Sequence, residues 1–336
     1  MVARDARWWL APVTALALAL ALAACSVADV DDGTDAESTD PAPSTSSAPE
    51  GFPVVAADDV QEQRWRLPGG PDWLAVDDEG VWVKRDDGTV DRIAPDTGEI
   101  AVTVKVLGEP CQGLGAGLGA VWACAGTDVV RIDPQTGEVM ATLAVGKTYS
   151  QGHLVTAFDQ LWILTGDGST LVGVDPRTGE PVTTVSLGAR GTDVAVGEAG
   201  LWVVSQVDGQ VLRIDPAGTV AVRATGLPRP TAVAVTDQVW VGSVGGTSRI
   251  DPDTGEIQAS TDIGAGLEGG LAIAPDGVWV RSAERFLIRL DPDSAAPVAG
   301  VAADVESSGD IVVAFGSVWT TAFDDAALFR LPIDAP

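Results

Sequence analysis

The chain contains few of the residues that most metal and redox centres use: one histidine, His153, and three cysteines among 336 residues. A single imidazole excludes zinc sites with several histidine ligands. The sequence also lacks the nucleophile elbow GxSxG, the zinc motif HExxH, the phosphate loop GxxxxGKS/T and the haem motif CxxCH. The glycine-rich run Gly113–Gly119 lies between predicted strands with no helix after it, so it does not predict a phosphate site. We therefore expect no nucleotide or haem cofactor.

Basic residues are also scarce, with 20 lysines and arginines against 48 acidic residues and a formal net charge of −28. Residues 1–24 hold two arginines and one aspartate, and residues 26–51 hold seven acids, so residues 52–336 have 18 basic and 40 acidic residues and a charge of −22. Nucleic acid and direct adsorption to anionic lipid are excluded as partners, because both need a basic face. Cationic partners or metal ions remain compatible with this charge, although acidity alone usually indicates solubility.

Only the N-terminus has a long apolar run, from Trp8 to Ala24, preceded by two arginines and followed by Cys25. This order predicts a signal peptide over residues 1–24. The ending Leu-Ala-Ala-Cys resembles the bacterial lipobox, which implies that Cys25 becomes the acylated first residue. Acyl chains such as palmitate, when more than one is present, attach a protein stably to the cell membrane, here on its extracytoplasmic face. The alternative is an uncleaved anchor or a plain signal peptide.

Residues 25–52 are predicted to be a lipidated cysteine followed by a disordered acidic tether. Seven acidic residues, no basic ones and many Ser, Thr, Pro and Ala fall between positions 26 and 51. Such a stretch cannot bury enough apolar surface to fold. Residues 53–336 are long enough for one domain with a large core, and none of their stretches is apolar enough to span a membrane.

Seven tryptophans recur in this domain at intervals of 38 to 40 residues, each in a short apolar run such as VWV or LWV: Trp82, Trp122, Trp162, Trp202, Trp240, Trp279 and Trp319. A second marker follows in most repeats, with the form RIDPxTGE. Strand-like runs at this period predict an all-β, seven-bladed β-propeller with four antiparallel strands in each blade. Because the tryptophan recurs in every repeat, we expect it to fill the wedge between blades and not to stack on a ligand.

The fourth repeat shows the predicted unit, with strands over residues 193–196, 201–206, 211–215 and 220–225. The Asp-Pro-x-Thr-Gly element predicts a tight turn, because Pro fixes φ, Asp accepts from backbone N–H groups and Gly takes a positive φ. A calcium loop would need further oxygen ligands at alternating positions, and these are missing.

The ends of the domain predict how the ring closes. After Trp319 only one more strand follows, over residues 327–331, so the last repeat lacks its outermost strand. Residues 60–67 precede the first inner strand and occupy the place of an outermost strand. We therefore expect this N-terminal strand to complete the last blade, which removes open sheet edges.

Cys111 and Cys124 both lie in the second repeat, flanking its inner hairpin. In an oxidising compartment this isolated pair predicts a disulfide. Two buried thiols are the alternative.

Counting back from each tryptophan gives the residue that begins each inner strand: Trp73, Gly113, His153, Asp193, Ala232, Gly270 and Asp310. These residues should form a ring at one mouth of the central channel, with Asp72 and Glu268 beside it. One imidazole and several carboxylates could hold a divalent cation or catalyse proton transfer, which makes His153, Asp193, Asp310 and Glu268 the candidate site residues. The alternative is a hydrated channel lined by ordinary polar side chains.

The phrase VWV followed by RIDPxTGExxxTxxxG resembles the streptogramin lyase-like and YVTN-type propeller repeats of bacterial envelope proteins, over residues 60–332. The resemblance implies the propeller fold, but these repeats serve enzymes, sensors and binding proteins alike. Streptogramin lyases abstract a proton with a histidine, a glutamate and magnesium, and rely on more than one histidine; this chain has one. The TGE turn is also similar to quinoprotein repeats, but their docking tryptophan is absent here, so no quinone is expected.

These features predict a membrane-anchored extracytoplasmic lipoprotein that acts as a non-enzymatic module for binding a small ligand or an envelope protein. The alternative is a metal-dependent lyase or hydrolase of the streptogramin lyase-like type with its site at the channel mouth. A purely structural envelope protein is a third reading.

Overall fold

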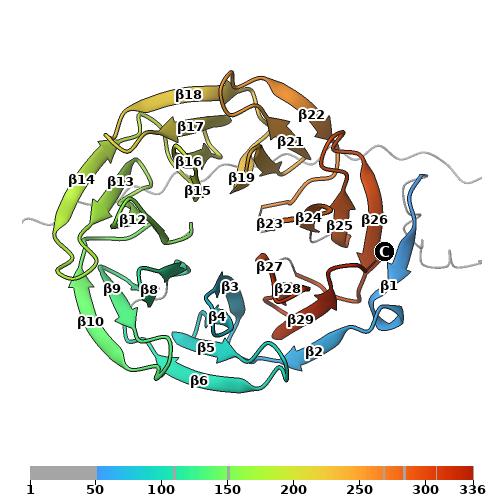
Figure 1. Cartoon of the computed structure of the whole chain (residues 1–336), viewed down its shortest axis with the longest axis horizontal. Coiled ribbons are helices and arrows are strands. Elements are labelled where there is room, and N and C mark those ends of the chain that lie inside the picture. The colour runs from blue at the N-terminus through green and yellow to red at the C-terminus, as the bar shows by residue number, and fades with distance from the viewer. Residues whose placement is uncertain are drawn as a thin grey trace, which may run out of the picture. The chain divides into compact units, whose positions relative to one another are not determined.

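The computed structural model describes residues 51–108, 111–149, 152–267, 269–282, 285–307 and 309–335. In these residues the strands form seven sheets arranged as a ring (Figure 1). The predicted seven-bladed all-β propeller is therefore confirmed. The predictions for the signal peptide, for Cys25 and for almost all of the tether fall outside the described residues. Within them, no helix is long and apolar enough to cross a membrane.

Blades 1 to 6 are each built from four strands that follow one another in the sequence. Blade 1 contains β3 (Pro71–Val76), β4 (Val81–Arg85), β5 (Thr89–Ile93) and β6 (Ile100–Lys105). Blade 2 contains β7 (Leu114–Gly117), β8 (Ala120–Ala125), β9 (Asp128–Ile132) and β10 (Val139–Ala144). Blade 3 contains β11 (Val155–Ala157), β12 (Gln160–Thr165), β13 (Thr170–Val174) and β14 (Pro181–Ser186).

The second half of the ring repeats this order. Blade 4 contains β15 (Asp193–Gly197), β16 (Gly200–Ser205), β17 (Gln210–Ile214) and β18 (Val220–Thr225), close to the predicted bounds. Blade 5 contains β19 (Pro230–Val235), β20 (Val239–Ser243), β21 (Gly246–Ile250) and β22 (Ile257–Thr261). Blade 6 contains β23 (Leu271–Ala274), β24 (Gly277–Ser282), β25 (Phe286–Leu290) and β26 (Pro297–Ala302). Blade 7 contains β27 (Ile311–Ala314), β28 (Ser317–Ala322) and β29 (Ala327–Pro332).

The fourth strand of blade 7 comes from the other end of the domain, as predicted. Strand β2 (Gln63–Arg66) pairs antiparallel with β29, so that Gln63 lies opposite Arg330. The two strands lie side by side at the seam of the ring (Figure 1). The ring of Trp65 in β2 stacks on Trp319 in β28, with centroids 5.7 Å apart. Backbone pairing and aromatic packing together close the propeller.

A strand that the sequence analysis did not predict precedes this closure. Strand β1 (Val54–Ala56) pairs parallel with β26 and adds a fifth strand to blade 6, and the short 3₁₀ helix η1 (Ala57–Asp59) connects it to β2. Val54 lies opposite Gly300, where an added Cβ would be 3.2 Å from Val54 and from Phe52. The glycine therefore leaves room for the extra strand to pack closely.

The seven repeated tryptophans, which we call the tryptophan layer, lie between neighbouring blades as predicted. All seven are 3% exposed or less. Each belongs to a core cluster that includes side chains of the next blade: Trp82 packs with Val121 and Ala123 of blade 2, and Trp319 packs with Val83 of blade 1. Every blade therefore depends on its neighbour for a large part of its buried apolar surface.

The Asp-Pro-x-Thr-Gly element forms the predicted turn. In the copy that begins at Asp133, the carboxylate accepts the N–H groups of Gln135 at 2.8 Å and Thr136 at 2.9 Å. Gly137 has φ +74°, and an added Cβ there would meet Val102 of the preceding blade at 2.3 Å. The backbone N–H groups of Thr136 and Gln135 lower the pKa of Asp133, because they stabilise its ionised form. This carboxylate therefore has a local structural role.

Candidate functional site

The residues predicted to begin the inner strands lie within two residues of the start of those strands and gather at one mouth of the channel. A pocket with a volume of about 110 Å³ is lined by six of the seven: Trp73, His153, Asp193, Ala232, Gly270 and Asp310. Gly113 does not line it, but its neighbour Gln112 does, together with Asp72. The remaining candidate, Glu268, lies outside the described residues. We call this set of pocket residues the mouth ring.

His153 lies between two carboxylates, one on each side of its ring. Its Nδ1 is 2.9 Å from Oδ1 of Asp193, and its Nε2 is 3.3 Å from Oδ2 of Asp310. When both ring nitrogens donate to these carboxylates, the imidazole carries a positive charge. Burial lowers the pKa of His153, but Asp193 and Asp310 outweigh that effect and raise the pKa well above its usual value of 6.5. The three side chains therefore form a charged clamp, which we call the His153 clamp.

Both carboxylates of the clamp also hold the backbone of the next blade. Asp193 accepts the N–H of Val233 in blade 5 through Oδ2, at 3.1 Å. Asp310 accepts the N–H of Leu74 in blade 1 through Oδ2, at 2.8 Å. Each carboxylate also accepts the N–H of the residue that follows it, at 2.8 Å. The mouth is therefore fixed in place by hydrogen bonds that cross from blade to blade.

Aromatic and polar groups surround the clamp. The ring of Trp73 meets the His153 ring edge-on, with centroids 4.5 Å apart and planes at 79°. The amide nitrogen of Gln112 donates to the carboxylate of Asp72 across the boundary between blades 2 and 1. Three aspartates and a single imidazolium line the pocket, together with the apolar side chains of Phe323 and Leu267. The lining is therefore acidic overall, with apolar surface beside it.

The clamp residues do not fit a divalent cation in this arrangement. Most lone pairs of Asp193 and Asp310 already accept N–H groups from the backbone or from His153. Across the described ranges, no three or more His, Cys, Asp or Glu side chains are grouped so that they could hold a metal ion. A general base also needs an unprotonated ring nitrogen, and both nitrogens of His153 are engaged. With both ring nitrogens engaged, His153 itself has no lone pair free to bind a metal or to remove a proton.

Sequence analysis did not identify two buried cations, although the repeat contains a signal for them. The position two residues after the conserved tryptophan is apolar in blades 3 and 4, where it holds Leu164 and Val204. In blades 1 and 6 the same position holds Lys84 and Arg281, and both residues are buried. The other five blades have uncharged residues at this position, so a charged residue there marks a special contact between blades.

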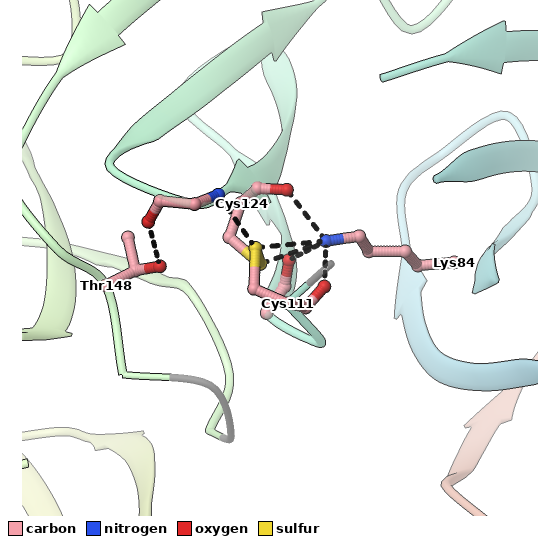
Figure 2. The surroundings of a disulfide bond; sticks show 6 residues. Lys84, Cys111, Cys124 and Thr148 are labelled. Atoms are coloured by element: carbon pink, nitrogen blue, oxygen red, sulfur yellow. Dashed lines mark hydrogen bonds between the residues drawn. A yellow bond between two sulfur atoms is a disulfide. The ribbon is translucent and has the colours of Figure 1, made fainter. Parts of the chain in front are cut away.

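Lys84 extends from β4 of blade 1 to the disulfide of blade 2 (Figure 2). The predicted bond between Cys111 and Cys124 is present, with Cα atoms 5.9 Å apart. The Lys84 ammonium donates to the carbonyl oxygens of both cysteines, at 2.8 Å for Cys124. Burial lowers the pKa of Lys84 to about 7, while Asp86 and Asp72 act in the opposite direction. Lys84 thus ties blade 1 to blade 2.

Arg281 makes the equivalent connection from blade 6 to blade 7. Its guanidinium donates to the carbonyl oxygens of Ser307 at 2.6 Å and Thr321 at 3.3 Å. Burial lowers the pKa of Arg281 to about 10, and the charge of Asp325 partly opposes this shift. Lys84 and Arg281 therefore both place a cation on the backbone of the next blade, but only Lys84 contacts sulfur.

Comparison with known proteins supports the fold. No protein-family model and no curated protein matches the chain. Among solved structures, the chain is similar to a streptogramin B lyase, with a TM-score of 0.66 and 16% identity over 80% of this chain and 96% of that one. It is also similar to virginiamycin B lyase from Staphylococcus aureus, with a TM-score of 0.65 and 17% identity over 81% and 99%. BamB from Moraxella catarrhalis gives a TM-score of 0.56 and 16% identity over 78% and 84%.

At these identities the likeness concerns architecture alone. The predicted resemblance to streptogramin lyase-like propellers is therefore confirmed for the fold. A fold alone does not define a function, so function has to be argued from the mouth of the channel.

Proposed function

We propose that this protein is an extracytoplasmic lipoprotein, anchored to the cell membrane through Cys25, that binds a small ligand or an envelope protein at the mouth of its propeller. The anchoring part rests on the sequence of residues 1–25, which lie outside the described residues. The binding part rests on one observation. At the mouth, His153 is held between two carboxylates with both ring nitrogens engaged.

The clamp favours recognition over proton transfer. An imidazole that donates from both nitrogens has no lone pair with which to remove a proton from a substrate. The two carboxylates are fixed by backbone N–H groups of the neighbouring blades, so the charges at the mouth have set positions before anything binds. A concave site with a few fixed polar groups and apolar surface beside them is typical of binding pockets.

The charge of the pocket indicates which groups it accepts. Asp72, Asp193 and Asp310 outnumber the single imidazolium, and the whole domain is acidic. Anionic groups are therefore disfavoured, and neutral polar or cationic groups are favoured. Trp73 and Phe323 provide aromatic surface against which such a group can pack.

Photo-crosslinking in intact cells tests the position of the binding site. Leu267 lines the mouth pocket and is 52% exposed, and Val222 lies on the outer strand β18 and is 55% exposed. Each is replaced in turn by benzoylphenylalanine, and the adducts are identified by mass spectrometry. We expect a reproducible adduct from position 267 and none from position 222. Equal labelling at the two positions, or none at position 267, would contradict binding at the mouth.

Anchoring is tested separately through Cys25. Cells that express the wild-type chain or the Cys25→Ser variant are labelled with an alkyne fatty acid and fractionated. We expect the label and membrane association in the wild type, and neither in the variant. A membrane-bound but unlabelled wild type would indicate an uncleaved anchor.

Divalent cations provide a further check on the alternative enzyme. We expect that Mg²⁺, Mn²⁺, Ca²⁺ and Zn²⁺ leave the melting temperature of the wild type and of His153→Ala unchanged. An ion-dependent increase in the wild type that is lost in His153→Ala would favour the metal-dependent lyase or hydrolase over a binding module.

A further inference from the structure

The disulfide of blade 2 lies beside a buried amine. Figure 2 shows Lys84 directed at both sulfur atoms from the neighbouring blade. Its Nζ is 2.9 Å from Sγ of Cys124 and 3.7 Å from Sγ of Cys111. Its other hydrogen-bond partners among the described residues are the carbonyl oxygens of Cys111, Gly113 and Cys124, and none of the ion pairs there involves Lys84. The cation nearest to the disulfide therefore has only neutral groups in direct contact.

A thiolate would be a suitable counter-ion at this position. A nearby lysine stabilises a cysteine thiolate and makes it a better leaving group in disulfide exchange. Of the two sulfur atoms, Sγ of Cys124 is 0.8 Å closer to the ammonium, as 2.9 Å compares with 3.7 Å. The negative charge produced by opening the disulfide is therefore stabilised better on Cys124 than on Cys111.

Cys111 is the more exposed of the two cysteines. Cys111 is 7% exposed and Cys124 is 2% exposed. A small cavity of about 50 Å³ adjoins the disulfide and is lined by residues that include Gly88, Gly108 and both cysteines. The N–H of Gly126 donates to Sγ of Cys111 at 3.3 Å, and the Gly126 carbonyl accepts from Thr148, which fixes this sulfur (Figure 2).

We propose that Cys111–Cys124 is a thiol–disulfide exchange site in which Cys111 is the sulfur attacked, Cys124 is the leaving sulfur and Lys84 is the residue that stabilises its charge. This site is separate from the His153 clamp and does not depend on what the mouth binds. Its partner is a dithiol reductant of the compartment in which the domain resides.

The exchange balances in two steps. One thiol of the reductant loses its proton to solvent, and its thiolate attacks Sγ of Cys111; the S–S bond breaks and its electron pair moves to Sγ of Cys124, beside Lys84. The second thiol, also deprotonated, then attacks the reductant sulfur in the mixed disulfide and releases Cys111 as a thiolate, which takes up a proton. The reductant leaves as a disulfide after giving two electrons to the protein. A disulfide oxidant reverses the sequence.

The direction of attack is tested on the wild-type chain. The folded, oxidised protein is treated with glutathione, quenched with acid, and the glutathione adduct is located by peptide mass spectrometry. We expect the adduct on Cys111, with Cys124 as the free thiol. An adduct on Cys124, or no reduction of the folded protein at all, would overturn the proposal.

The role of Lys84 is tested by rates of reduction. Lys84→Met removes the charge with little change in volume, and Arg281→Met makes the equivalent change in blade 6, away from the disulfide. We expect reduction by dithiothreitol to be about tenfold slower in Lys84→Met and changed by less than about twofold in Arg281→Met, because the leaving thiolate loses its cation only in the former. Equal rates in Lys84→Met and the wild type would also overturn the proposal.

Discussion

The tryptophan layer and the mouth ring are built from the same repeat but use it in opposite ways. In the layer every blade contributes the same residue, and each indole packs against the next blade. In the mouth ring six of the seven blades contribute the equivalent position, but the side chains there range from Gly270 to Trp73. Repetition therefore marks the part that holds the propeller together, and departure from repetition marks the part that distinguishes this propeller from others.

Lys84 and Arg281, in the second strands of blades 1 and 6, are also departures from the repeat. Five blades have another residue where blades 1 and 6 have Lys84 and Arg281. Both cations donate to carbonyl oxygens of the next blade. A departure from the repeat can therefore be structural, as for Arg281, or can bring a cation to a reactive group, as for Lys84.

The largest effect on stability is expected at the pairing of β2 with β29, because this pairing closes the propeller that contains both the tryptophan layer and the mouth ring. Deletion of residues 52–68 removes β1 and β2, exposes the edge of β29 and takes Trp65 from Trp319. We expect loss of cooperative unfolding, measured by circular dichroism during heating. Deletion of residues 52–56 removes β1 alone and should leave a folded domain. An unchanged melting temperature in the longer deletion would show that the ring does not need β2.

A substitution in each of the two regions sharpens the comparison. Trp122→Ala removes a fully buried side chain from the tryptophan layer and should lower the free energy of unfolding by about 3–5 kcal/mol. Trp73→Ala, in the mouth ring, removes a side chain that is only partly buried and should have a much smaller effect. Urea denaturation measures both. Equal losses of unfolding free energy in the two variants would mean that the mouth ring contributes as much to stability as the tryptophan layer.

Removing a carboxylate that links two blades should have an intermediate effect on stability. Asp310→Ala leaves the N–H of Leu74 and the His153 imidazole without their acceptor, and we expect a loss of about 1–3 kcal/mol in urea denaturation. Asp78→Ala, in an exposed turn, is the control and should change stability by no more than about 0.5 kcal/mol. If the two variants unfold at the same urea concentration, the mouth is not held by Asp310.

The smallest effect concerns the charge of His153. Because the pKa is raised in the folded state, the protonated ring stabilises the fold fully below the unfolded value of about 6.5, and this contribution is lost as pH rises through the folded-state pKa. The difference in unfolding free energy between the wild type and His153→Gln should therefore shrink from pH 6 toward alkaline pH. Because the chain has a single histidine, its imidazole Hε1 NMR signal is unambiguous, and it should remain in its protonated position at neutral pH. Titration of that signal at or below about pH 6.5 would contradict the clamp.

Residue spacing made most of the fold predictable. The tryptophans predicted the number of blades, and the missing outer strand at the C-terminus predicted the role of residues 60–67. The extra strand β1 could not be predicted, because three residues in a parallel pair show no alternation of polar and apolar positions. The alternation of polar and apolar residues predicts a strand only where the strand is long enough to show it.

The site was predictable in its members but not in its contacts. Counting along the repeat placed His153, Asp193 and Asp310 at one mouth. Their hydrogen bonds could not be predicted, because His153 and Asp310 are 157 residues apart and meet only across the closed ring. The backbone N–H groups that donate to these carboxylates could not be predicted either, because they belong to the neighbouring blades.

The seam between β2 and β29 has a consequence for biosynthesis. A ribosome makes residues 63–66 long before residues 327–332, so the first strand must wait for almost the whole domain to be translated before it finds its partner. Contacts of such high sequence separation form late and slowly. A chain that ends prematurely before β29 therefore cannot complete the ring. Its unpaired sheet edges stay exposed to aggregation and proteolysis.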